Sequence, residues 1–177
     1  GGRQAVSATA AGWIAVGGVT GSAFLGGLAL SVRAATKAEA EQICQRKGRK
    51  SLPRSVVAIM DDQTGHARAL LLARLLFDAV AYGAAVWWAS AIMGDQQPLL
   101  LHFVVGLGAA VCMLWLGSIV VAGSLAAYAA EPLVIGSATL IRALAILTTP
   151  LWTVARGVDE VVRRLVGAAA GTRLHRQ

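Results

Sequence analysis

Three apolar stretches, each long enough to cross a bilayer, constrain this chain more than any other feature. Residues 5–32 contain no charged side chain, and residues 99–130 contain none either. Residues 69–93 are apolar except for Arg74 and Asp78. About 20 helical residues cross a hydrocarbon core of about 30 Å, so an apolar stretch of this length predicts a membrane-spanning helix. We therefore expect an all-α membrane protein with three transmembrane helices and further juxtamembrane helices on the cytoplasmic side.

The composition agrees with a membrane protein. Of the 177 residues, 56% are hydrophobic and only 14% are charged, whereas about a quarter of a soluble domain is charged. The net charge of +7 comes from basic residues that lie beside apolar stretches. This placement indicates membrane topology and contact with anionic lipid. We expect membrane lipid as a partner and no nucleic acid.

The basic residues also predict the orientation. Eight Lys and Arg residues lie in the hydrophilic segment 33–68, and none lies in the short connector 94–98. The positive-inside rule places segment 33–68 in the cytoplasm. The chain is then an integral protein of the plasma (inner) membrane, with its N-terminus outside and its C-terminus in the cytoplasm. The predicted parts are an N-terminal extracytoplasmic segment (1–11), a three-span transmembrane domain (12–130), a juxtamembrane helical belt (131–166) and a basic tail (167–177).

The cytoplasmic segment contains its own helix signals. Thr36 and Glu39 have the spacing of a capping box that opens a short helix ending near Arg46. A second helical stretch is predicted around 56–60, and the polar residues 61–65 end it. The second span is expected to begin near residue 67.

The stretch 133–155 leaves two readings open, a fourth span or helices along the inner membrane face. A fourth crossing places the five arginines that follow it outside, against the positive-inside rule. We therefore favour helices along the inner face, with the third span ending near Pro132 and a break at Pro150.

Polar residues inside the spans are the candidate site. A charge at the bilayer centre costs about 2.5–3.5 kcal/mol. Arg74 and Asp78 lie at i and i+4, where they can neutralise each other, and Arg74 can snorkel toward the cytoplasm. Mg²⁺ prefers oxygen ligands, so Asp78, Ser22 and Ser118 form the candidate metal site. The purely structural reading of the ion pair stays open beside it.

Small residues recur four apart in the first span, at Gly17 and Gly21, Gly18 and Ser22, and Ser22 and Gly26. This spacing is typical of helices whose backbones approach closely. The chain contains no zinc-protease motif, no phosphate-binding glycine loop and no recognisable nucleophile set. We expect no enzyme.

The order of these parts resembles the transmembrane domain of the CorC/cyclin M (CNNM) magnesium transporter family. Residues 22–33 (SAFLGGLALSVR) resemble the family's first span, and residues 71–78 (LLARLLFD) take the place of the start of its second span. The resemblance implies a homodimer that transports or binds Mg²⁺. It also implies a cytoplasmic CBS-type partner domain, which is absent from this chain.

The chain departs from the family pattern at the ion site. The family's first-span Glu falls at Gly26 or Gly27, and its two second-span Asn residues fall at Arg74 and Asp78. The Glu, Pro and Lys of its third-span signature are absent from residues 117–122. These departures support an alternative function, a non-transporting membrane anchor or an assembly and regulatory module that has lost the ion site.

Overall fold

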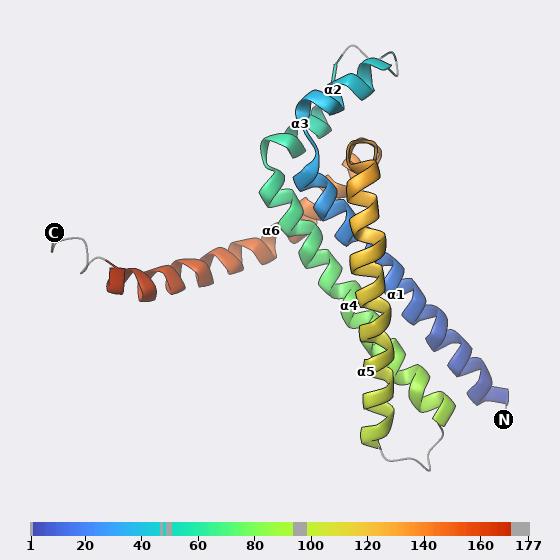
Figure 1. Cartoon of the computed structure of the whole chain (residues 1–177). Helices are drawn as coiled ribbons and strands as arrows, with labels where there is room; N and C mark the ends of the chain where they lie inside the picture. The colour runs from blue at the N-terminus through green and yellow to red at the C-terminus, as the bar shows by residue number, and fades with distance from the viewer. Residues whose placement is uncertain (1, 47, 49–50, 94–98, 171–177) are drawn as a thin grey trace.

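The computed structural model describes residues 2–46, 48, 51–93 and 99–170, with the side chains of residues 8–46, 48, 51–93, 99–117 and 119–150. Throughout this part of the chain, every regular element is a helix (Figure 1). In chain order, the helices are α1 (Gly2–Ala34), α2 (Lys37–Arg46), α3 (Arg54–Asp61), α4 (Gln63–Met93), α5 (Leu99–Leu116), the π-helix η1 (Gly117–Val121) and α6 (Ala122–Ala170).

Three helical stretches are long and apolar enough to cross a membrane: Ala8–Ala34, Gln63–Met93 and Leu99–Pro150. The predicted all-α class with three candidate spans is therefore confirmed at this level. α1 and α4 lie side by side in opposite directions, and α5 returns along α4 (Figure 1).

Two of the helices begin earlier than the apolar stretches that predicted them. α1 begins at Gly2, so the predicted segment 1–11 continues the first span as helix over its described part. α4 begins at Gln63 instead of residue 67. Asp62 explains this start, because its Oδ1 accepts a hydrogen bond of 2.9 Å from the Gly65 backbone N–H, as an N-cap residue does. Hydropathy marks the lipid-facing part of a helix, whereas capping marks its end.

The helix signals predicted in segment 33–68 are confirmed. The Glu39 backbone N–H donates to the Thr36 hydroxyl at 3.4 Å, and that hydroxyl donates to Glu39 Oε2 at 2.9 Å. This pair opens α2, which ends at Arg46 as expected. The second predicted stretch is α3, which ends at Asp61.

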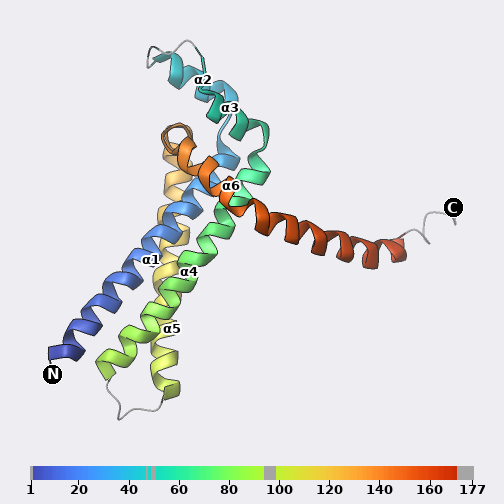
Figure 2. The same ribbon diagram turned by 180° about the vertical axis from the view of Figure 1, so that it is seen from behind.

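The chain changes direction between the third span and the rest of α6. Ala129 has non-helical backbone angles (φ −142°, ψ 26°) inside α6. Pro132 accounts for the kink, since its ring lacks an N–H and clashes with the carbonyl four residues earlier, at Tyr128. After the kink, α6 crosses α1 and α4 instead of running alongside them (Figure 2). The break predicted at Pro150 is wrong, because α6 continues through this residue to Ala170.

A helix can pass through Pro150 because proline removes only one backbone hydrogen bond when its neighbours remain helical. Just before it, the hydroxyls of Thr148 and Thr149 each donate at 2.8 Å to the preceding turn, to the carbonyls of Leu144 and Ala145. Side-chain bonds of this kind accompany prolines tolerated in apolar helices.

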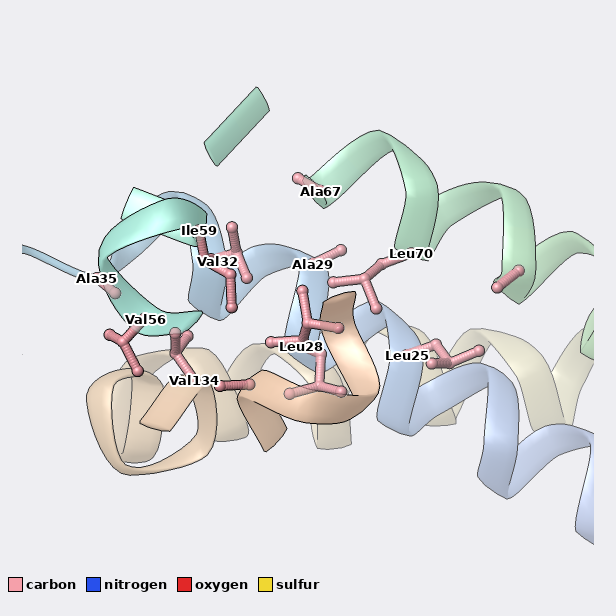
Figure 3. Packing of buried hydrophobic residues seen from close by; sticks show 13 residues of the cluster. Leu25, Leu28, Ala29, Val32, Ala35, Val56, Ile59, Ala67, Leu70 and Val134 are labelled. Carbon is pink, nitrogen blue, oxygen red and sulfur yellow. The ribbon is translucent and has the colours of Figure 1, made fainter. Parts of the chain in front are cut away.

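One buried core joins the ends of α1 and α4 that carry Arg33 and Arg68 to α3 and α6 (Figure 3). Leu28 and Val32 of α1 contribute to it, together with Ile59 of α3, Leu70 of α4 and Val134 of α6, and all five side chains are fully buried. At about 1.5–3 kcal/mol for each large aliphatic side chain removed from water, this core fixes α3 and α6 against the spans.

Candidate intramembrane polar cluster

α1 and α4 carry the same two residue types, a Trp and an Arg, at the same spacing. Trp13 and Arg33 lie 20 residues apart in α1, and Arg68 and Trp88 lie 20 residues apart in α4. At 1.5 Å per residue, each distance is about 30 Å, the thickness of a hydrocarbon core. Because the two helices run in opposite directions, both arginines are at one end and both tryptophans at the other.

Ser22 and Asp78 lie near the middle of these two intervals, and the structure brings them together. The Ser22 hydroxyl donates a hydrogen bond to Asp78 Oδ1. Arg74 Nε donates to the Ser22 oxygen at 3.2 Å and lies 3.6 Å from Asp78 Oδ2. Ser22 is fully buried, and the side chains of Arg74 and Asp78 are 25% and 19% exposed. We call these three residues the polar cluster.

Glycines of α1 make room for the polar cluster. A Cβ atom added at Gly26 would lie 3.0 Å from Nη1 of Arg74, so the guanidinium fills the space beside this glycine. A Cβ atom at Gly18 lies only 2.9 Å from the Ala81 backbone nitrogen. The predicted close approach of backbones is therefore present between α1 and α4. Gly17, although next in sequence, has nothing within 4 Å of its Cβ position and lies outside the contact.

The π-helix η1 packs against α1 beside the polar cluster. A Cβ atom at Gly117 lies 3.2 Å from Ala23 Cβ, directly after Ser22. The Ala122 N–H bonds to the Gly117 carbonyl five residues earlier, which defines the π turn. π turns inside α-helices are frequent at functional sites. The Ser118 side chain lies outside the described residues, so the third predicted metal ligand cannot be compared with the other two.

Arg74 packs between α1 and α4. Its Nε bonds to Ser22 and faces Asp78, and its Nη1 lies beside Gly26, one helical turn nearer Arg33 than Ser22 is. The guanidinium thus points toward the end of α1 that carries Arg33, and snorkelling of Arg74 stays a prediction. The sequence showed the i, i+4 spacing of Arg74 and Asp78, but nothing in it showed that Ser22 joins both side chains from another helix.

The polar cluster is electrically balanced. It combines one carboxylate with one guanidinium, and both carboxylate oxygens already face a partner within the chain. Among the described residues, no group of three or more His, Cys, Asp or Glu side chains is placed to hold a metal ion. A protein site for Mg²⁺ ordinarily supplies one or two carboxylates and retains several waters. The arrangement favours a neutral link between helices.

Comparison with family models, with curated proteins and with solved structures found no match to this chain.

Proposed function

We propose that the chain is a non-transporting membrane module of the inner membrane, an anchor or an assembly module whose polar cluster fastens α1 to α4. The proposal includes the orientation: α2, α3 and the part of α6 after the kink lie on the cytoplasmic side, and the N-terminus lies outside. The observation that carries it is the position of Arg74, whose guanidinium lies beside the Ser22 and Asp78 oxygens.

The charges support this function over ion transport. At a separation of about 4 Å and an effective dielectric constant of about 20, a divalent cation and a guanidinium repel each other by about 8 kcal/mol. At a coordination distance of about 2 Å, the attraction between Mg²⁺ and the single Asp78 carboxylate is about 16 kcal/mol. The guanidinium therefore offsets about half of this attraction, and only the remainder is left to meet the cost of removing water from Mg²⁺.

A second candidate is Mg²⁺ binding or transport by a CorC/CNNM-like domain. One observation favours it: Ser22 and Asp78, predicted as ligands from separate spans, share a hydrogen bond. This function requires Arg74 to leave the polar cluster. The homodimer and the CBS-type partner that the resemblance implies remain proposals tied to this candidate.

A Mg²⁺ titration of the purified chain distinguishes the two functions. A ligand that binds only the folded state stabilises it by about 2.7 kcal/mol at 100 times its Kd. If the chain is a non-transporting module, millimolar Mg²⁺ leaves the melting temperature in detergent unchanged, both for the wild type and for Asp78→Asn. A saturating rise in the wild type that disappears in Asp78→Asn overturns the proposal. Ser90→Ala serves as control, since the Ser90 hydroxyl bonds only to the nearby Trp87 carbonyl.

A further inference from the structure

An apolar groove lies between α1, α4 and α5, away from the polar cluster. These helices spread apart toward the end that carries the N-terminus (Figures 1 and 2). The groove between them has a volume of about 470 Å³. Small residues form its floor, among them Ala15, Ala85 and Ala110, which are all buried.

The lining excludes a charged or strongly polar occupant. Among the described residues that line it, no side chain is charged, and the polar groups are the Thr9 hydroxyl and the indole N–H groups of Trp13 and Trp88. A charge placed here has nothing to offset its loss of hydration. The occupant is therefore apolar along the length of the groove.

The dimensions of the groove select one extended chain. It reaches along α1 from Ala8 to Val19, a length of about 16 Å at 1.5 Å per residue. This length is about half of a hydrocarbon core of about 30 Å, which is the reach of one acyl chain within a single leaflet.

The depth of the groove shows from which side it is filled. Trp13 and Trp88 lie at the end opposite Arg33 and Arg68, and tryptophans gather where a membrane meets water. Val19 and Met113 also line the groove, and Val19 precedes Ser22 by about one helical turn. The groove thus runs from the outer membrane surface toward the bilayer centre, which is the path of a lipid tail in the outer leaflet.

We propose that this groove binds a single acyl chain of an outer-leaflet phospholipid, with the headgroup at the level of Trp13 and Trp88. The atoms that line an empty space lose van der Waals contacts on that side. One hydrocarbon chain in the groove restores those contacts and needs no polar partner. Because the lining recognises the tail, binding does not depend on an anionic headgroup.

The test uses the full chain in detergent, incubated with dioleoylphosphatidylcholine and released for native mass spectrometry. Because this lipid is zwitterionic, its headgroup binds only weakly to the basic segments of the chain. Wild type is expected to retain one phospholipid per protomer. Ala109→Leu places a larger side chain in the groove and is expected to reduce retention at least fivefold. Gly108→Leu is the matched control, since a Cβ atom added at Gly108 would have nothing within 4 Å. This variant is expected to retain the lipid.

A second groove variant, Val16→Phe, guards against a folding defect in the first, because Val16 lines the groove but is 44% exposed. Both variants are compared only if their melting temperatures match that of Gly108→Leu. The proposal is overturned if wild type retains no phospholipid or if both groove variants retain it fully. It is also overturned if the groove variants convert a dimer to a monomer without losing lipid, since a second copy then occupies the groove.

Discussion

Arg74 Nε lies 3.2 Å from the Ser22 hydroxyl, and this hydroxyl donates in turn to Asp78. One serine of α1 therefore contacts both charged side chains of α4. The hydroxyl accepts from the cation and donates to the anion, so its donor and acceptor functions are both used. The link is specific to a serine-sized hydroxyl and to this alignment of the two helices.

Removal of the carboxylate is expected to destabilise the chain. Asp78→Ala removes the carboxylate that faces Arg74, at a cost on the order of 2 kcal/mol. This is below the roughly 3–5 kcal/mol of a fully buried pair, since both side chains are partly exposed. Denaturant unfolding in detergent measures the loss. The double variant Arg74→Ala with Asp78→Ala is expected to recover most of the stability; a double variant no more stable than Asp78→Ala contradicts this account.

Replacement of two neighbouring glycines by alanine is expected to change the stability of the chain in opposite directions. Gly18→Ala forces a methyl group against the Ala81 backbone, at a cost of about 1–3 kcal/mol. Gly17→Ala meets nothing within 4 Å and is expected to stabilise α1 by up to about 1 kcal/mol, because alanine has the higher helix propensity. Melting temperatures of the two variants test the alignment of α1 with α4, and equal shifts count against it.

The cap of α2 is expected to control how often that helix opens. Thr36→Ala removes the acceptor of the Glu39 N–H, which costs about 1 kcal/mol. Amide hydrogen exchange in the first turn of α2 is then expected to accelerate about fivefold. Glu39→Gln preserves the capping-box pattern and is expected to exchange as the wild type does. Equal acceleration in both variants refutes the role assigned to Thr36.

The orientation of the chain is open to a direct labelling test. Ser51→Cys introduces an exposed thiol between α2 and α3, in a background where Cys44 and Cys112 are replaced by Ala. With segment 33–68 in the cytoplasm, a membrane-permeant maleimide is expected to label intact cells and an impermeant one is not. Labelling by the impermeant reagent reverses the proposed topology.

Sequence patterns predicted the helices more reliably than the contacts between them. The capping box at Thr36 and the end of α3 at Asp61 depend on residues adjacent in the chain, so local chemistry was sufficient. The rotation of α1 against α4 depends on atoms far apart in sequence. Hydropathy cannot distinguish Gly17 from Gly18, although only Gly18 meets the Ala81 backbone.

The polar cluster could be predicted only in part for the same reason. The i, i+4 spacing placed Arg74 and Asp78 on one face, and Ser22 was named only as a possible oxygen ligand for Mg²⁺. The π turn at Gly117 gave no signal, because residues 117–121 are compatible with an ordinary helix. The contacts of Arg74 with Ser22 and Gly26 could not be predicted from the spacing within α4, because both residues belong to α1.

The equal 20-residue separations of Trp13 from Arg33 and of Arg68 from Trp88 match α1 and α4 in length. In a bilayer, both helices then require the same hydrocarbon thickness. A thicker membrane is expected to thin locally around the chain, at a cost of fractions of a kcal/mol per Å of mismatch. We therefore expect the chain to prefer membranes whose hydrocarbon layer is close to 30 Å thick.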